Sequence, residues 1–184
     1  MTRSHTAGLA AVDDAFALVR AGVGGLSDGA ARAPSLLPGW SRGHVITHLA
    51  RNADGNRNMV DGAIAGEERE QYPGGADRRA ADIEAGAQRS ARALVEDFQS
   101  SHAALVAAWH RVPDDGWERV GISFALGARP ILDGLGSRRR ELLVHLVDLD
   151  LGFDPIDLPA DFVVDQAEWL REFRTVDTWP GAPW

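Results

Sequence analysis

Residues 138–152, Arg-Arg-Arg-Glu-Leu-Leu-Val-His-Leu-Val-Asp-Leu-Asp-Leu-Gly, predict a helix that carries metal-ligand chemistry on one face. Glu141 and His145 are four residues apart, so both side chains project from the same side of a helix and could reach one cation. An apolar stripe beside this pair predicts that the helix lies at the edge of a bundle core. The stripe consists of Leu135, Leu142, Leu146 and Leu149. Because a catalytic zinc ion takes three protein ligands, at least one more must come from elsewhere in the chain.

The composition excludes several classes of protein. The chain has 184 residues, which suits one domain, and a net charge of -8, which argues against a nucleic-acid or anionic-membrane partner. It contains no cysteine, so it can form neither a disulfide nor a thiolate nucleophile of its own. No apolar run is long enough to span a membrane, and the N-terminus lacks a signal pattern, so we expect a cytoplasmic protein.

Apolar residues at helical spacing predict an all-α protein. We expect helices over about residues 6–26, from an N-cap at Ser41 to about residue 64, over 81–110, and from Pro130 into the stretch above, with one more short helix in the last 30 residues. Residues 67–80 are expected to be a loop, and residues 117–129 a short strand or an extended connection.

The second predicted helix supplies candidates for the missing ligand. His44 and His48 are four residues apart and share one face, so either could complete the site. The alternative for each is a buried histidine that is hydrogen-bonded to a carbonyl or a carboxylate. Bundle helices can bring two such faces together across a core. His102 and His110, in the third predicted helix, are expected to be exposed to solvent.

Three motifs resemble one known family. Residues 37–54, Leu-Pro-Gly-Trp-Ser-Arg-Gly-His-Val-Ile-Thr-His-Leu-Ala-Arg-Asn-Ala-Asp, are similar to the early signature of the mycothiol-dependent maleylpyruvate isomerase family, which belongs to the DinB-like metal-binding bundles. Arg140-Glu141 followed by residues 145–149, His-Leu-Val-Asp-Leu, resembles the second signature. Tyr72-Pro and residues 81–86 fit its middle, so the resemblance covers about residues 5–155.

This resemblance implies a DinB-like four-helix bundle that holds zinc (Zn2+) or another divalent metal through His48, Glu141 and His145. The family's ligand is the histidine followed by Leu-Ala, which favours His48 over His44. Asp148 is then a candidate for an outer carboxylate, which does not bind the metal but orients the imidazole of a ligand by a hydrogen bond. The bundle would occupy residues 1–155, with residues 156–184 as a C-terminal tail packed on it.

The resemblance also implies that mycothiol, a low-molecular-weight thiol, is activated at the metal. Isomerisation of maleylpyruvate by this route requires addition of a thiolate to the cis double bond, rotation about the resulting single bond, and elimination. The substrate carboxylates would need cationic or polar partners. The candidate substrate- or cofactor-binding residues are His44, Arg51, Asn52, Arg138 and Arg140, with Arg57 as a further cation.

Other functions remain open. The family's isomerase has a smaller domain after the bundle, whereas this chain ends about 30 residues beyond it. A mycothiol S-transferase, which adds the thiol to another small electrophile, would use the same activated thiolate. The same histidine and glutamate spacing also fits a non-catalytic metal-binding bundle, or a bundle whose histidines are structural. The helix pattern is compatible with a monomer and with a homodimer.

Overall fold

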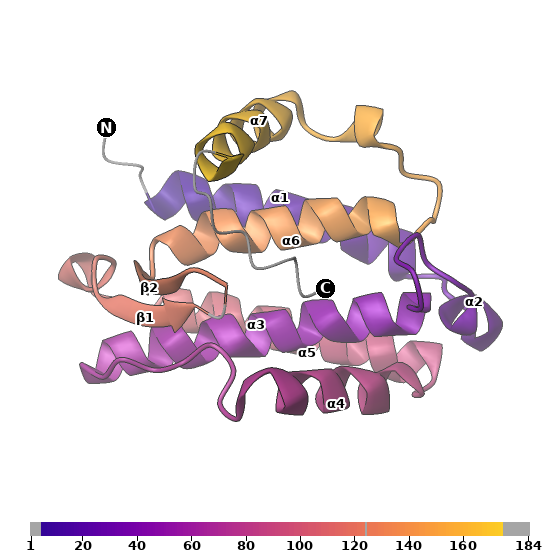
Figure 1. Cartoon of the computed structure of the whole chain (residues 1–184), viewed down its shortest axis with the longest axis horizontal. Helices are drawn as coiled ribbons and strands as arrows, with labels where there is room; N and C mark the ends of the chain where they lie inside the picture. The colour runs from indigo at the N-terminus through magenta and orange to yellow at the C-terminus, as the bar shows by residue number, and fades with distance from the viewer. Residues whose placement is uncertain (1–4, 124, 175–184) are drawn as a thin grey trace. The chain divides into compact units, whose positions relative to one another are not determined.

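The computed structural model describes residues 5–123 and 125–174, with side chains through residue 170. This part of the chain contains seven α-helices and one β-hairpin. The chain divides into two units, residues 1–152 and residues 153–184. The helices of the first unit are, in order, α1 (His5–Val23), α2 (Asp28–Arg32), α3 (Arg42–Ala65), α4 (Gly75–Ala87), α5 (Ala91–Trp109) and α6 (Asp133–Asp148) (Figure 1).

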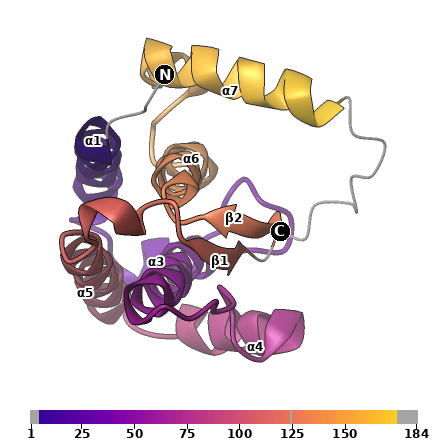
Figure 2. The ribbon, with the colours of Figure 1, turned by 90° about the vertical axis from the view of Figure 1, so that its left-hand side faces the viewer.

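Four of these helices form a bundle. Viewed end-on, α1, α3, α5 and α6 occupy the four corners, and α4 lies outside the bundle along α3 (Figure 2). Large apolar side chains fill the interior, among them Leu49, Leu94, Phe98, Leu105, Leu142 and Leu146. Burying such side chains is the main stabilising contribution to the fold. The prediction of an all-α, DinB-like four-helix bundle is confirmed.

Helix α3 is the central element, because it contacts α4, α5 and α6. The predicted N-cap at Ser41 is confirmed, since its hydroxyl accepts a hydrogen bond from the His44 amide. The helix ends at Gly66, whose φ of 76° is easily adopted only by glycine. At Gly55, a Cβ atom would lie only 2.8 Å from the carbonyl oxygen of Gln71. Glycine here therefore lets the chain that precedes α4 approach α3 closely.

A short hairpin connects α5 to α6. It follows a 3-10 turn (Asp114–Gly116) and pairs β1 (Val120–Ser123) with β2 (Gly127–Pro130) in antiparallel register, Val120 opposite Pro130. The predicted strand is therefore present as β1, but the segment predicted as one short strand or an extended connection also contains a second strand, β2. The prediction that Pro130 begins a helix is wrong, because Pro130 ends β2 and α6 starts at Asp133.

The predicted third helix is two helices. The chain turns between Ala87 and Ala91, where Ser90 has an extended backbone and its hydroxyl accepts a hydrogen bond from the Ala93 amide. Ser90 thus starts a new helix, and the prediction of one helix over 81–110 is wrong. The predicted loop at 67–80 is also too long, since α4 already begins at Gly75.

His102 is buried, so the prediction that it is exposed is wrong. Only 4% of the residue is accessible, and its ring stacks on Phe16 of α1 with 3.7 Å between the ring centroids. Burial lowers the pKa of His102 to about 3, which keeps the imidazole neutral. His110, one residue beyond α5, is exposed as predicted.

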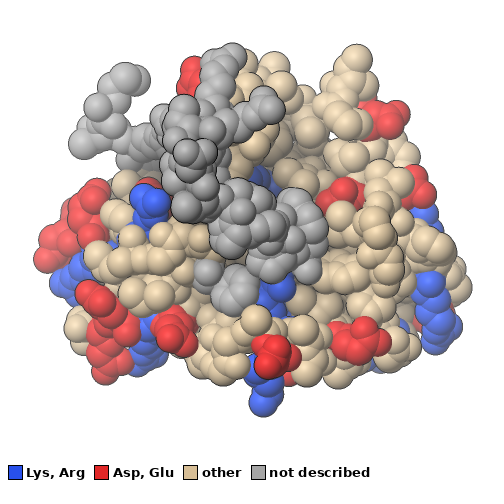
Figure 3. All heavy atoms as spheres, viewed as in Figure 1, with Lys and Arg blue, Asp and Glu red and all other residues tan. Residues whose placement is uncertain are grey.

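The second unit contains a 3-10 turn (Pro155–Asp157) and the helix α7 (Ala160–Arg174), which confirms the predicted helix near the C-terminus. The packing of the C-terminal segment on the bundle stays a prediction. Residues 175–184 lie outside the described part of the chain. No described helix combines the length and apolar character needed to cross a membrane. On the face drawn in Figure 3, acidic and basic side chains are interspersed among uncharged ones.

Candidate metal centre

Three potential metal ligands converge where α3 faces α6. His48 comes from α3, and Glu141 and His145 come from α6, one turn apart. One ligand atom of each side chain lies within 4.8 Å of the other two, and no other group of three or more His, Cys, Asp or Glu within the described ranges meets this condition. The packing of α3 against α6 thus brings together residues that are 93 positions apart.

The distances within this group are short. The Nε2 atom of His48 lies 2.7 Å from Oε2 of Glu141, and Nε2 of His145 lies 3.5 Å from the same oxygen. The two imidazole rings meet edge to face with 4.7 Å between centroids. Both histidines are about 95% buried, whereas the Glu141 side chain is 30% exposed. The group therefore lies in the wall of the bundle and is open to solvent on the side of the carboxylate.

Asp148 forms a hydrogen bond with the ring nitrogen of His145 that faces away from Glu141. Its Oδ2 atom lies 2.8 Å from Nδ1 of His145, as the spacing of three residues on α6 allows. Burial lowers the pKa of His145, but hydrogen bonds to Asp148 and Glu141 outweigh it and raise the pKa to about 9. Burial likewise raises the pKa of Glu141, yet the two imidazoles hold it well below its usual value. The metal-free site therefore contains a carboxylate and a protonated His145.

His48 has a different environment. Its Nδ1 atom lies 2.9 Å from a terminal nitrogen of Arg79, which α4 carries. Burial lowers the pKa of His48 to about 4, so this imidazole is neutral near pH 7. The ring of Trp40 lies beside it, with 5.7 Å between centroids. The guanidinium of Arg79 also lies over the ring of Tyr72, 5.3 Å from its centroid.

Sequence reasoning missed Arg79, because it falls in the segment predicted to be a loop. A helical reading of that segment would have found it. Arg79 lies four residues before Ile83, which is buried, and seven before Gly86, where a Cβ atom would meet the side chain of Thr47 on α3. These three positions share the face of α4 that packs against α3.

The donor set suits a divalent metal such as zinc. Two imidazole nitrogens and one carboxylate oxygen are the ligands of many catalytic zinc sites, and they leave one coordination position open. Donors on a tetrahedral zinc ion lie about 3.4 Å apart, so the 3.5 Å separation already matches, whereas the 2.7 Å hydrogen bond between His48 and Glu141 would have to lengthen on metal binding. Asp148 is placed as the outer carboxylate that ligating histidines commonly have.

Comparison with known proteins agrees with this geometry. A family model described as "Mycothiol maleylpyruvate isomerase N-terminal domain" matches residues 12–150. The chain belongs to this family. It is similar to the crystal structures of the mycothiol-dependent maleylpyruvate isomerase and of a mutant in which one histidine is replaced by alanine. Each is 27% identical over 89% of this chain and 68% of the other, with a TM-score of 0.84. No curated protein matches the chain.

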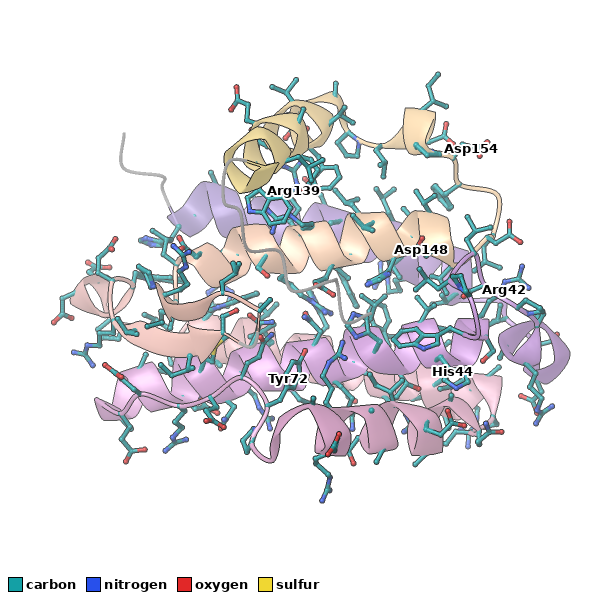
Figure 4. All side chains as sticks on the ribbon, viewed as in Figure 1. Arg42, His44, Tyr72, Arg139, Asp148 and Asp154 are labelled. Atoms are coloured by element: carbon teal, nitrogen blue, oxygen red, sulfur yellow. The ribbon has the colours of Figure 1, made fainter. Side chains whose placement is uncertain are left out.

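In this member of the isomerase family, His44 does not join the three potential ligands. Its Nδ1 atom lies 2.7 Å from the hydroxyl of Ser41, which helps to cap α3, and its Nε2 atom lies 3.0 Å from Glu84 of α4. In Figure 4, His44 lies on the side of α3 next to α4, whereas Asp148 lies on α6. His44 therefore connects the start of α3 to α4.

The other candidate binding residues are spread along α3 and α6. Arg51 donates two hydrogen bonds to Asp97 of α5, so its guanidinium already has a carboxylate partner. The Nε atom of Arg57 lies 4.0 Å from Oδ2 of Asp61, one turn further along α3, so this guanidinium also has a carboxylate nearby. Arg140 immediately precedes Glu141, and burial lowers its pKa.

Arg138 and Asn52 lie in the interior, Arg138 one turn before Glu141 on α6 and Asn52 one turn after His48 on α3. Arg138 is fully buried, and its Nη1 atom donates to the carbonyl oxygen of Leu49 and to the amide oxygen of Asn52. Burial lowers the pKa of Arg138 to about 10, so it remains a cation at neutral pH. This buried charge raises the positive potential beside the ligand group.

Proposed function

We propose that this chain is a metal-dependent enzyme that uses the thiol of mycothiol in the manner of the maleylpyruvate isomerase. The observation that carries the proposal is the convergence of His48, Glu141 and His145 in a chain that belongs to this family. The similarity of fold to the solved isomerase supports it. The absence of cysteine from the sequence requires that any reacting thiol come from another molecule.

The protein's own residues would hold the ion and shape its surroundings. His48, Glu141 and His145 would bind it, and a divalent ion with an open position lowers the pKa of a thiol that binds there. Asp148 accepts the Nδ1 hydrogen of His145 and would thereby leave Nε2 as the nitrogen that binds the ion. The Trp40 ring lies beside His48, with 5.7 Å between the ring centroids.

The proposed reaction is cis–trans isomerisation of a small unsaturated acid. It requires thiolate addition to the double bond, rotation about the resulting single bond, and elimination of the same thiolate, so that atoms and charge balance. The buried cation Arg138 favours the accumulation of negative charge beside the ligand group. Arg140, next to Glu141 in sequence, is a candidate partner for a substrate carboxylate.

A mycothiol S-transferase is the second candidate. It would need the same bound metal and the same thiol, but would stop after addition to an electrophile. The 27% identity to the solved isomerase favours keeping this alternative, because substrate preference depends on few side chains.

Zinc binding and a thiol-dependent assay test the proposal. Calorimetry should show about one zinc ion per chain for the wild type and the loss of binding in His48→Ala and His145→Ala, while His110→Ala, which changes an exposed histidine, binds normally. Maleylpyruvate turnover that requires both zinc and mycothiol supports an isomerase. Stable adducts with other electrophiles, without isomerisation, support a transferase. Zinc binding without either reaction would refute the enzymatic proposal.

A further inference from the structure

The two histidines of the metal centre differ in the group that faces their second ring nitrogen. Nδ1 of His145 faces the carboxylate of Asp148 at 2.8 Å, and a carboxylate accepts a hydrogen. Nδ1 of His48 faces the guanidinium of Arg79 at 2.9 Å, and a guanidinium can only donate. Asp148 therefore keeps a hydrogen on Nδ1 of His145, which leaves Nε2 available to a metal once the second proton is lost. Arg79 instead favours the His48 tautomer that has no hydrogen on Nδ1.

The two hydrogen bonds of His48 determine which of its ring nitrogens carries the hydrogen. Because Arg79 donates to Nδ1, this atom carries the lone pair, and the ring hydrogen lies on Nε2. That hydrogen points to Oε2 of Glu141, 2.7 Å away. Both ring nitrogens of His48 are thus engaged by protein groups, and the nitrogen needed by the ion carries a hydrogen.

A metal bound to Nε2 needs the reverse arrangement. The lone pair must then lie on Nε2 and the hydrogen on Nδ1, where it would face the N–H of Arg79. Two donors cannot share a hydrogen bond, so the contact between Arg79 and His48 would be lost. We propose that Arg79 competes with the metal for His48, and that metal binding moves its guanidinium off the imidazole. This inference rests on the proposed metal site.

The position of Arg79 fits such a role. It lies on α4, outside the four bundle helices, so its side chain can change rotamer without moving a ligand-bearing helix. The ring of Tyr72 already lies under the guanidinium, with 5.3 Å from the guanidinium carbon to the ring centroid, and can retain it by a cation–π contact. Arg79 therefore adjusts the affinity of the site for metal without being a ligand.

The neighbouring residue Arg78 provides a matched control. It lies on the same helix and is 69% exposed, and its Nε atom forms an ion pair with Asp82 at 2.9 Å. Replacing Arg78 therefore removes one positive charge from α4 without touching His48. Any effect of the net charge of α4 on metal affinity appears in both variants, whereas the effect of removing the guanidinium from His48 appears only at Arg79.

The experiment compares wild type, Arg79→Gln and Arg78→Gln by calorimetric zinc titration of the full chain. In the Arg79→Gln variant, the glutamine amide oxygen can accept the Nδ1 hydrogen of His48, which the guanidinium cannot do. Zinc affinity should rise about tenfold in Arg79→Gln, the scale seen for groups that contact metal ligands, and stay near wild type in Arg78→Gln.

Nitrogen-15 NMR of the imidazoles gives a second readout without metal. In chelator-treated wild type, His48 should carry its hydrogen on Nε2, and this hydrogen should shift toward Nδ1 in Arg79→Gln. Equal or weaker zinc affinity in Arg79→Gln, or an Nδ1 hydrogen on His48 in the metal-free wild type, would overturn the inference and leave the proposed function intact. Absence of zinc binding in the wild type would instead overturn the proposed function, and the inference with it.

Discussion

The pH dependence of stability in the metal-free chain should report the proton on His145. The folded chain holds this proton with a pKa of about 9, whereas the unfolded chain releases it near 6.5. Between these values the folded state binds more protons than the unfolded state, so stability falls as the pH rises. The contribution of His145 is complete below pH 6.5 and is lost as the pH passes through 9. Since one pKa unit corresponds to about 1.4 kcal/mol, it amounts to about 3 kcal/mol.

Urea unfolding in the presence of a chelator measures this contribution. The free energy of unfolding is determined for the wild type and for His145→Gln at several values between about pH 6 and 9.5. The difference between the two proteins should shrink by about 3 kcal/mol over this window, because the variant has no proton to lose. His110→Gln, which replaces an exposed histidine, should follow the wild type.

One result would refute this reasoning. If the difference between wild type and His145→Gln stays constant from about pH 6.5 to 9, the hydrogen bonds to Asp148 and Glu141 do not hold a proton on His145. An NMR titration of the His145 ring should then give a midpoint near about 6.5 or below. The charge assigned to the metal-free site would be wrong.

A change of pH and two substitutions test other parts of the structure. Zinc affinity, measured by calorimetry, should rise about tenfold from pH 7 to pH 8, because binding displaces the one proton on His145; a flat profile would contradict this. Asp148→Ala should weaken zinc binding about ten- to hundred-fold at constant pH, and an unchanged affinity would show that the carboxylate does not orient the ligand. Gly55→Ala should destabilise the chain by about 1–3 kcal/mol in thermal unfolding, since its Cβ would meet the carbonyl of Gln71. Gly136→Ala, in an exposed part of α6 with open space around the new Cβ, should stabilise it by about 0.5–1 kcal/mol.

The helix boundaries show where sequence reasoning is limited. Ser41 begins α3 as its side chain predicts, because capping is a local interaction over three residues. Ser90 caps α5 in the same way, but apolar spacing runs through it and predicted one continuous helix. His102 lies four residues after Phe98 and three before Leu105, both fully buried, so the apolar spacing of α5 places it on the buried face and the prediction of exposure overlooked this pattern. Only its partner, the ring of Phe16 on α1, depends on the tertiary structure.

The sequence by itself determined that Glu141 and His145 share a helix face, because a spacing of four residues sets this wherever the helix packs. It also determined that any reacting thiol must be external. Only the tertiary structure decided what each histidine of α3 contacts: His44 meets Ser41 and Glu84, and His48 meets Glu141. The same holds for the contact between Arg79 and His48. Spacing is set by the geometry of a single helix, whereas the partner of each face is set by how helices distant in the sequence pack together.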